Sequence, residues 1–524
     1  MTTVYSLVNE RAQQNPNKVF LTAAETGREL EFAQLRQYSE QVNTVLNRLN
    51  VERGATVGFL MDNGYWTTAL FLGVMYSGRV VLPLNAVAGP DQIDYVLSHS
   101  DVQVVFVCAT YAEKFSQVIA RYASQIQFID SCEDDGPDRS VCPEFDQPVE
   151  ASAQNTDSDE TALMIYTSGT TGRPKGVLLS HNNVVAGGRN TMLAHDLTER
   201  DISLCVLPLY HINAEMVSVM APLVSNSEVV MSRKLSITNF WSWIEEHGCT
   251  WFSAVPTIIS YLVEQRQRDD KAISQGDSSV SAQQPDFTKI QAQVRFGRSA
   301  SAALSPATHQ LFETLFSIPI VETMGISECA AQILSNPMAR GENQYGSPGV
   351  AIGNEIRIVD QSHRTLAAGE KGEIAVRGDN IMKGYYKNPE ATAEALDDEG
   401  WFYTGDLGYM DDGGFVFVTG RSKELIIKGG ENVAPREIDD VLYKHPAVLE
   451  AAAFGIPDPH YGQEIMASVA IKPGHECDAD TLLDHCQGLL GKYKTPKSIE
   501  VLDELPKGPS GKIQRLKLAD RFSD

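Results

Sequence analysis

The chain has 524 residues, with 43 Lys and Arg against 68 Asp and Glu, a formal net charge of −25 and 43% hydrophobic residues. At roughly 100–200 residues per domain, this length predicts several structural units, and the apolar content is typical of a globular enzyme. The acidic balance argues against non-specific binding of nucleic acid, which needs basic patches to displace counterions.

The eight cysteines are scattered without CxxC pairs, as expected for reduced thiols in a cytoplasm rather than for a disulfide framework or a metal site. The N-terminal residues lack the basic-then-apolar pattern of a signal peptide. The longest apolar region, 57–84, is interrupted by Asp62, Asn63 and Arg79 and by Gly64, Gly73 and Gly78, which is not typical of a membrane span. We therefore expect a cytoplasmic protein without a membrane span.

The first part of the chain alternates helical and strand-like patterns. Helices are predicted at 30–49, 66–76 and 91–97, and strands at 57–60, 80–84 and 102–107. The acidic, proline-containing stretch 131–160 predicts an irregular connector to a buried strand at 162–165. Such alternation is typical of parallel sheets covered by helices.

The alternation resumes further along the chain. The predicted helices are 184–193, 240–246 and 306–315, and the predicted strands are 203–207, 251–254, 294–296 and 318–321. Between them, 265–289 is rich in Ser, Gln and Asp and predicts a mobile surface insertion. After Gly420 the pattern shifts to shorter units, so we place a domain boundary at about residue 421, between domains 1–420 and 421–524.

A Gly/Ser/Thr-rich loop follows the strand at 162–165 and reads YTSGTTGRPKGV over Tyr166–Val177. Backbone amides and hydroxyls in such a loop can surround phosphate oxygens, and Lys175 adds positive charge. The P-loop of kinases and GTPases is excluded, because counting from Gly169 places Pro174 where that motif requires its second glycine. The loop predicts a nucleotide-phosphate site made by Lys175 with Thr167, Ser168, Gly169, Thr170, Thr171 and Gly172.

The same loop resembles, almost residue for residue, the phosphate-binding signature of the adenylate-forming superfamily, which includes acyl-CoA synthetases, carrier-protein adenylation domains and beetle luciferases. Six further segments resemble that superfamily in the expected order. The resemblance implies an α/β fold in which a large N-terminal domain of helix-covered mixed sheets and a β-barrel-like subdomain carry a small, mobile α+β C-terminal domain. It also implies ATP, Mg²⁺ and CoA as cofactors.

The segment PLYHINAE, at 208–215, places His211 at the start of a predicted helix. The resemblance implies that His211 is a wall and gate of the acid pocket, with a catalytic role, and that Asn213 faces the acyl group.

The segment VRFGRSASAAL, at 294–304, resembles the strand and loop that line the adenine and the acyl chain. It departs from the usual Ser-Gly-Ala-Ala-Pro-Leu at Ala300, Ser301 and Ala303, yet small residues still allow a flat base to approach Ser301. The acid pocket is further expected to include Arg298, Ser299 and Thr323; Arg298 is a candidate anion partner, with a purely structural role as the alternative.

The segment ETMGISE, at 322–328, resembles the family's Tyr-Gly-x-Thr-Glu motif, with Met324 in place of the tyrosine. Met324 beside Gly325 implies an adaptable apolar cover for the adenine. By position, Ser327 is expected at the phosphate, and Glu328 is expected to hold Mg²⁺, which prefers carboxylate and phosphate oxygens.

Three later segments carry the remaining expected residues. In YTGDLG, at 403–408, Asp406 corresponds to the carboxylate that grips the ribose hydroxyls. The run 420–438 supplies Arg421 for ribose or phosphate, Lys423 at the hinge, and the loop Lys428, Gly429 and Gly430 that lines the pantetheine channel. Near the chain end, LPKGPSGKIQR places Lys512 at the position of the family's catalytic lysine.

These features predict an AMP-forming acyl-CoA ligase that converts a carboxylic acid to an acyl-adenylate and then to a CoA thioester. One alternative is a stand-alone adenylation enzyme that loads an acid or amino acid onto a carrier-protein phosphopantetheine, although the segment 208–213 lacks the Phe-Asp pair that commonly holds an α-amino group. A non-catalytic homologue is disfavoured because the expected functional residues are all present.

The acid pocket is expected to be polar, because Asn213, Ser299, Ser301, Glu322 and Thr323 line it. This composition favours a short carboxylate with a second anionic group over a long fatty acid. The segments 298–306 and 335–337 also resemble the oxalate–CoA ligase branch, so oxalate or a sulfonated acid such as sulfoacetate would suit the pocket. The sequence leaves the oligomeric state open.

Overall fold

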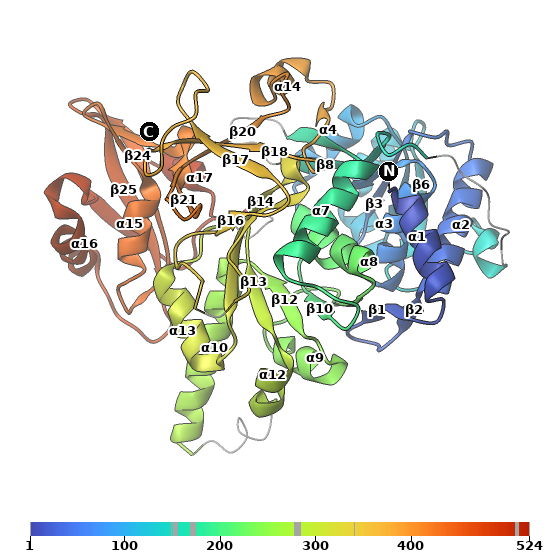
Figure 1. The fold of residues 1–524 in the computed structure, drawn as a ribbon, viewed down its shortest axis with the longest axis horizontal. Coiled ribbons are helices and arrows are strands. Elements are labelled where there is room, and N and C mark those ends of the chain that lie inside the picture. The colour runs from blue at the N-terminus through green and yellow to red at the C-terminus, as the bar shows by residue number, and fades with distance from the viewer. Residues whose placement is uncertain are drawn as a thin grey trace.

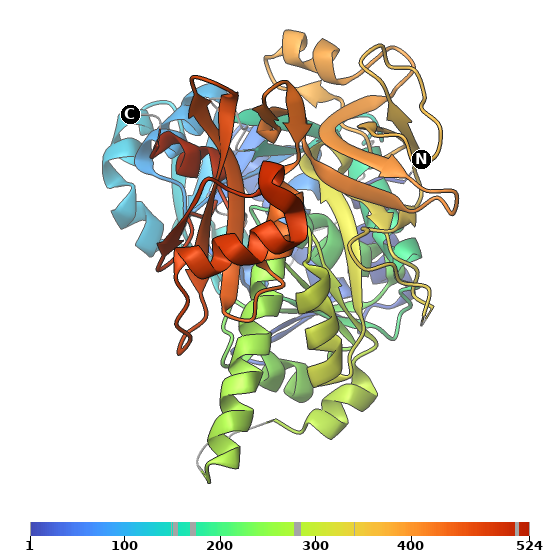
Figure 2. The same cartoon turned by 90° about the vertical axis from the view of Figure 1, so that its left-hand side faces the viewer.

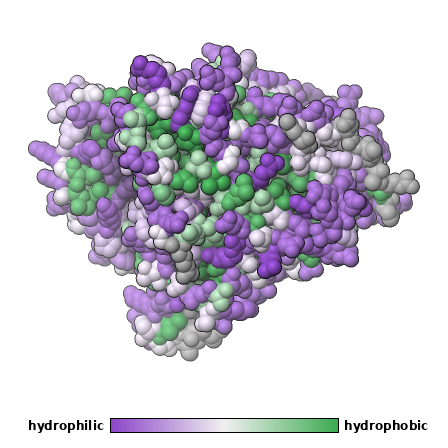
Figure 3. All heavy atoms as spheres, viewed as in Figure 1, coloured by the Kyte–Doolittle hydropathy of each residue, from purple (hydrophilic) through white to green (hydrophobic). Residues whose placement is uncertain are grey.

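The computed structural model describes residues 2–147, 149, 156–167, 174–276, 285–339, 341–508 and 513–522. Two large sheets and their helices form the body of the molecule, and the C-terminal strands and helices form a separate unit at one side (Figure 1). On the face seen in Figure 1, apolar residues gather across the middle of the surface (Figure 3). Among the described residues, no helix is long and apolar enough to cross a membrane.

The first large sheet has eight strands in the order β19-β9-β8-β4-β3-β5-β6-β7. Its strands are β3 (Thr56–Leu60), β4 (Val80–Pro83), β5 (Val102–Val107), β6 (Gln127–Cys132), β7 (Gly136–Pro137), β8 (Thr161–Thr167), β9 (Lys175–Ser180) and β19 (Gly384–Tyr385). The five strands from β8 to β6 are parallel. Runs such as VQVVFV in β5 suit this position, because a parallel strand is covered on both faces. The associated helices are α2 (Phe32–Arg48), α3 (Tyr65–Tyr76), α4 (Pro90–His99), α5 (Ala109–Lys114), α6 (Ser116–Tyr122) and the short η1 (Pro143–Asp146).

The second large sheet has nine strands in the order β16-β15-β14-β13-β12-β10-β11-β1-β2, parallel from β14 to β1. Its strands are β1 (Val19–Ala23), β2 (Glu29–Glu31), β10 (Ile202–Cys205), β11 (Glu228–Met231), β12 (Trp251–Ala254), β13 (Phe296–Ser299), β14 (Ile320–Ile326), β15 (Ala331–Ser335) and β16 (Val350–Ala351). The helices beside it are α1 (Val4–Gln14), α7 (His181–Ala194), the π-helix η2 (Asn213–Met220), α8 (Ala221–Ser225), α9 (Phe240–His247), α10 (Pro256–Ser274), α12 (Phe287–Gln293), α13 (Pro306–Phe316) and the 3-10 turn η3 (Ser327–Cys329).

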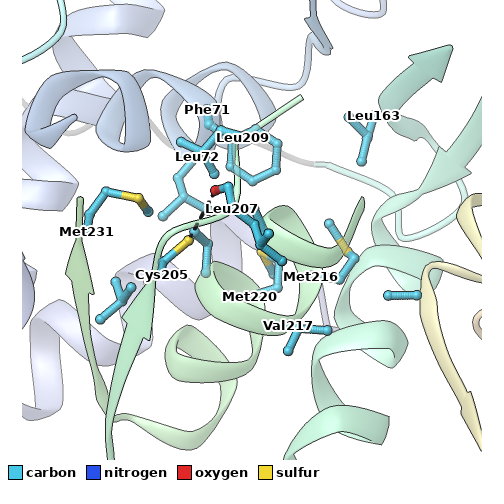
Figure 4. Packing of buried hydrophobic residues seen from close by; sticks show 14 of the residues in the cluster. Phe71, Leu72, Leu163, Cys205, Leu207, Leu209, Met216, Val217, Met220 and Met231 are labelled. Atoms are coloured by element: carbon cyan, nitrogen blue, oxygen red, sulfur yellow. Dashed lines mark hydrogen bonds between the residues drawn. The ribbon is translucent and has the colours of Figure 1, made fainter. Parts of the chain in front are cut away.

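The main hydrophobic core joins the helices of both sheets. Every residue of α3 is buried, as expected for a helix that is apolar on all sides. The π-helix η2 is likewise buried along its whole length, and Figure 4 shows Met216, Val217 and Met220 of η2 among Leu207 and the α3 residue Phe71. Burying one such side chain contributes about 1.5–3 kcal/mol, so this core holds η2 firmly in place.

A smaller antiparallel sheet and the C-terminal unit complete the chain. The sheet has the order β17-β18-β20-β21, with β17 (Glu355–Val359), β18 (Gly372–Arg377), β20 (Phe402–Met410) and β21 (Val416–Arg421), and α14 (Pro389–Ala395) lies beside it. The C-terminal unit contains η4 (Ser422–Glu424), β22 (Ile426–Lys428), β23 (Glu431–Val433), α15 (Pro435–Leu442), β24 (Val448–Asp458), β25 (Gly462–Ile471), α16 (Ala479–Lys494), β26 (Ser498–Leu502) and α17 (Arg515–Asp520). Its buried residues form clusters of their own. The fold class is thereby confirmed, while the boundary at 421 stays a prediction.

Most predicted elements are found within a few residues of their expected ends, but the insertion predicted at 265–289 is partly wrong. Helix α10 continues to Ser274 and projects from the body in both views (Figures 1 and 2). Its buried Ile258 and Leu262 anchor the first turns. The polar second half lacks Gly and Pro, and ion pairs between Glu264 and Arg268 and between Arg266 and Asp270 support it at helical spacing. Polar composition alone was therefore a poor guide here.

Candidate active site

The predicted phosphate loop lies in the chain between two paired strands of the eight-stranded sheet. Thr167 ends β8 and lies opposite Lys175, the first residue of β9. Ser168, Gly169, Thr170, Thr171 and Gly172 lie outside the described residues. The pairing of the two strands fixes Lys175 at the base of the loop.

Lys175 and the expected metal ligand Glu328 both contact the side chain of Tyr385. Strand β19 pairs with β9, which places Tyr385 opposite Val177. The Nζ of Lys175 is 4.6 Å from the centre of the Tyr385 ring, and the Tyr385 hydroxyl donates to Oε1 of Glu328 at 2.9 Å. Burial and the Glu328 carboxylate raise the pKa of Tyr385, so the phenol stays protonated and keeps Glu328 oriented. Sequence reasoning missed Tyr385, and only the pairing of β19 with β9 reveals it.

Asp406 and Arg421 form a second pair beside this group. They lie directly opposite each other in β20 and β21, and Nε of Arg421 donates to Oδ1 of Asp406 at 2.9 Å. The negative charge of Asp406 raises the pKa of Arg421, with further contributions from Glu424 and Glu328. The structure therefore brings Asp406, Arg421 and Glu328 into one electrostatic neighbourhood, and their predicted roles stay predictions.

The residues around Glu328 suit a magnesium ion that is held mainly by phosphate. The described residues contain no group of three or more His, Cys, Asp or Glu able to hold a metal. Mg²⁺ is commonly bound through one or two carboxylates together with substrate phosphates and water. A single oriented carboxylate beside the phosphate hairpin matches that donor set.

A tight turn presents Ser327 and Glu328. Strand β14 ends at Ile326, and β15 returns antiparallel to it through η3. A Cβ added to Gly325 would lie 1.9 Å from the carbonyl oxygen of Ala331, so only glycine allows this approach of the two backbones. Met324 precedes it and is buried at 9% exposure.

A buried polar network lies at the end of β13. Arg298 donates from Nη1 to Oδ1 of Asn213 and to Oγ of Ser253, both at 3.1 Å, and from Nη2 to Oε1 of Gln332 at 2.9 Å. The exposures of these residues are 1% for Arg298, 5% for Asn213, 1% for Ser253 and 0% for Gln332. Burial lowers the pKa of Arg298 to about 9, which leaves the guanidinium charged at neutral pH. The structure joins Arg298 to Asn213, and sequence reasoning missed Ser253 and Gln332.

The other expected pocket residues divide between the two faces of the sheet. Ser299 lies opposite Glu322 in the register of β13 and β14, and successive residues of a strand point to opposite faces. Ser299 and Glu322 therefore lie on one face, and Arg298 and Thr323 on the other. Thr323 still contacts the neighbouring strand, since its hydroxyl donates to the backbone oxygen of Ser299 at 3.3 Å.

Glu322 is the buried acid of this region. Its Oε1 accepts from the backbone N–H of Leu304 at 3.2 Å, and the side chain is 2% exposed. Burial raises the pKa of Glu322 to about 7. Ser301, which follows β13, adopts a left-handed backbone with φ 73°.

His211 lies two residues before Asn213, the first residue of η2, near the position predicted for a helix start. Its backbone N–H donates to the carbonyl of Pro208, and its own carbonyl accepts from the N–H of Glu215. The ring lies 4.8 Å from that of Tyr210 and is half-buried.

The loop predicted to line the pantetheine channel is the turn of a β-hairpin in the C-terminal unit. Lys428 lies opposite Glu431, and Gly429 and Gly430 between them have φ of 56° and 86°. A two-residue turn with both φ values positive favours glycine. The Nζ of Lys428 pairs with Glu464 at 2.5 Å, so its charge is held within the C-terminal unit. Lys423, the predicted hinge, is exposed in η4.

The segment that carries Lys512 contacts the N-terminal body through another lysine. Lys512 itself lies outside the described residues. Lys507 bridges to Ile513, and its Nζ lies 2.8 Å from Glu450 and donates to the Tyr261 hydroxyl of α10 at 3.2 Å. This contact places the end of the chain beside α10.

Two family models match the chain: the AMP-binding enzyme model over residues 8–386 and the AMP-binding enzyme C-terminal domain model over residues 437–512. The chain belongs to the AMP-binding enzyme family. A sulfoacetate–CoA ligase of Cupriavidus necator is 42% identical to it over 98% of this chain and 97% of its own length. An oxalate–CoA ligase of Arabidopsis thaliana is 31% identical, over 99% of this chain and 98% of its own. Among solved structures, ATP-bound MatB from Rhodopseudomonas palustris matches with a TM-score of 0.88 at 27% identity, covering 100% of this chain and 99% of the other.

These comparisons confirm the predicted class of enzyme. This AMP-binding enzyme is an AMP-forming acid–CoA ligase that uses ATP, Mg²⁺ and CoA. The roles of its individual site residues remain predictions, of which the pairs Asp406 with Arg421 and Asn213 with Arg298 are now supported by direct contacts.

Proposed function

We propose that this ligase activates a short carboxylic acid with a second anionic group, such as oxalate or sulfoacetate, and that Arg298 binds this second group. The observation that carries the proposal is that Arg298 is buried and that, among the residues the structure describes, its side-chain hydrogen-bond partners are all neutral. A buried cation without a counterion is costly, and a substrate anion would supply the missing charge. The relatives named for sulfoacetate and oxalate support the same class of acid.

The proposed reaction has two steps. The carboxylate oxygen attacks the α-phosphorus of ATP, the bond to the bridging oxygen breaks, and pyrophosphate leaves. The thiolate of CoA, after loss of its proton to solvent, then attacks the acyl carbon, and AMP leaves with the bonding electrons. AMP replaces an oxide leaving group, so the protein mainly has to position the reactants and neutralise charge.

We assign the charged residues to the first step as follows. Lys175 neutralises the triphosphate together with residues 168–172, and Lys512 has the role of bridging the carboxylate and the α-phosphate. Asp406, oriented by Arg421, accepts hydrogen bonds from the ribose hydroxyls. Glu328 would hold Mg²⁺, which would supply positive charge to screen the phosphate oxygens.

Smaller residues shape the nucleotide and acid sites in this proposal. Ser301, Met324 and Gly325 approach the adenine, Ser327 contacts the phosphate, and His211 gates the acid. The left-handed backbone of Ser301 after β13 and the close approach of Gly325 to Ala331 support the positions assigned to these two residues.

The second step is proposed to follow a rotation of the domain 421–524 about Lys423. The rotation withdraws Lys512 and brings the hairpin of Lys428, Gly429 and Gly430 to the pantetheine channel. We also propose a cytoplasmic location, which the eight free cysteines support.

The test measures AMP and pyrophosphate release with ATP, Mg²⁺ and CoA for sulfoacetate, oxalate, propionate and a long-chain acid. We expect a preference for the two dianions. Arg298→Met is expected to lower kcat/KM for the preferred dianion by roughly 100-fold, because removing one partner of a buried charge contact commonly costs 2–5 kcal/mol. Arg298→Lys, which keeps the positive charge, should lower kcat/KM for the dianion less than Arg298→Met does. KM for ATP should not change in either variant. Equal kcat/KM for propionate and the dianions in the wild type would contradict the proposal.

A further inference from the structure

The surroundings of Arg298 differ from those of another buried arginine in the same chain. Arg79 is 3% exposed and uses all three of its nitrogens, donating to Asn43, Asn47, Ser77 and twice to Val51. Its hydrogen bonds are thus complete without a ligand. Arg298 instead leaves Nε buried and without a partner among the described residues.

Asn213 leaves a second donor unused at the same place. Its Oδ1 accepts from Nη1 of Arg298 and from the hydroxyl of Ser253 at 2.9 Å, which fixes the orientation of the amide. The Nδ2 group is consequently turned away, and it is buried without an acceptor in the described part of the chain. Two buried donors of one network therefore lack acceptors, and an anionic group with several oxygens would satisfy both.

Gln332 holds the guanidinium from the opposite side. Its Nε2 donates to the carbonyl of Leu334 at 2.7 Å, so its Oε1 must face Nη2 of Arg298 at 2.9 Å. The amide thus aims the guanidinium without neutralising its positive charge. A carboxylate at this position would aim it equally well but would form an internal ion pair.

We propose that Gln332 is a specificity-determining positioning residue: its neutral side chain orients Arg298 and leaves the charge of Arg298 available to the second anionic group of the substrate. The inference rests on the proposed function, because it acts through Arg298. Gln332 does not need to touch the substrate. Its contribution is that the side chain at this position is an acceptor and carries no charge.

The test compares two acids of one shape, sulfoacetate and 3,3-dimethylbutanoate, in which a tetrahedral tert-butyl group replaces the sulfonate. For Gln332→Glu, we expect the ratio of kcat/KM for sulfoacetate over 3,3-dimethylbutanoate to fall about 100-fold, mainly through KM, because the introduced carboxylate repels the sulfonate and pairs with Arg298. Gln332→Met is the matched control, since it also loses the bond to Leu334 but adds no charge, and it should lower the ratio less than 10-fold.

A pH profile separates the charge effect from a structural one. Protonation of the introduced carboxyl should restore the sulfoacetate preference of Gln332→Glu towards low pH, and Gln332→Met should show no such recovery. If Gln332→Glu fails to fold, Asn213→Asp places a carboxylate on Nη1 of Arg298 and should lower the same ratio with the same pH dependence.

Two outcomes distinguish this inference from the proposed function. Suppose that the wild type prefers sulfoacetate and that Gln332→Glu and Gln332→Met each lower kcat/KM for both acids by the same factor at every pH. Gln332 is then only structural, and the inference is wrong. If the wild type itself does not discriminate between the two acids, the proposed function fails first.

Discussion

Replacing the buried Glu322 by glutamine should make the protein more stable at neutral pH. The folded state raises the pKa of this carboxyl from 4.5 to about 7 because of burial. Between these two values the folded protein holds a proton that the unfolded chain releases, so stability falls as the pH rises and levels off above pH 7. At 1.36 kcal/mol per pKa unit, the loss amounts to about 3 kcal/mol. Glutamine has no charge to bury and escapes this loss, while its Oε1 can still accept from the N–H of Leu304.

The expected size of the effect is measurable by thermal unfolding. For a cooperative unit of roughly 400 residues, an unfolding entropy of about 2.1 cal/mol/K per residue converts 3 kcal/mol to a shift in Tm of about 3–4 °C. Calorimetry of the ligand-free wild type and Glu322→Gln, at one scan rate and at several pH values from 5 to 8, gives the difference in Tm. This difference should increase with pH and reach a plateau above pH 7. A difference that is independent of pH, or that decreases as the pH rises, would refute the reasoning.

Glu313 provides a matched control, because replacing it by glutamine should change the stability in the opposite direction. Burial raises the pKa of its carboxyl, but hydrogen bonds from His309, Tyr345 and the N–H of Ile320 outweigh burial and lower it below 4.5. Its ionised form therefore stabilises the folded state above the unfolded pKa, and this stability is lost as the pH falls through the folded pKa. Glu313→Gln should unfold at a lower temperature than the wild type at pH 7, with the gap closing towards pH 4.

Three further predictions concern the nucleotide site and the catalytic lysine. Gly325→Ala should lower Tm and ATP-dependent activity, since its Cβ would lie 1.9 Å from the carbonyl oxygen of Ala331; an unchanged Tm by calorimetry would contradict the close approach. Asp406→Asn should raise KM for ATP at least 10-fold, because it weakens both the contact with Arg421 and the acceptance from the ribose diol; a steady-state ATP titration in which KM stays constant would exclude the ribose role. Lys512→Ala should lower the rate of adenylation by roughly 10²–10³-fold and spare thioester formation from supplied acyl-adenylate, whereas equal loss of both half-reactions would contradict the assignment.

The sequence was most informative about site residues that a short stretch of chain connects. Asp406 was expected at the ribose and Arg421 at the ribose or phosphate, and the two residues lie opposite each other because β20 and β21 form one antiparallel pair. Lys175 was expected at the phosphates, and the pairing of β8 with β9 fixes it at the base of the hairpin. In these cases a short connection along the chain already determines which residues meet.

Contacts between distant segments were not predictable in this way. Tyr385 contacts Lys175 only because β19 adds to the edge of the sheet beside β9, and nothing in the local sequence around Tyr385 indicates that pairing. Gln332 and Ser253 meet at Arg298 from two different strands. The continuation of α10 to Ser274 was missed for another reason, since its residues are polar but are good helix formers.

The two arginines of the site illustrate how the same side chain can serve opposite purposes. Arg421 is paired with Asp406, so the pair carries little net charge and Arg421 mainly orients a carboxylate. Arg298 is surrounded by neutral acceptors, so its charge is oriented but not compensated. An uncompensated buried charge destabilises the folded protein until an anion binds. On the proposed function, binding of the dianionic acid and stability of the fold are therefore linked, because a ligand that binds only the folded state stabilises it. Discrimination against a monoanionic acid of equal shape then needs no steric exclusion, since such an acid would leave Nε of Arg298 and Nδ2 of Asn213 without acceptors.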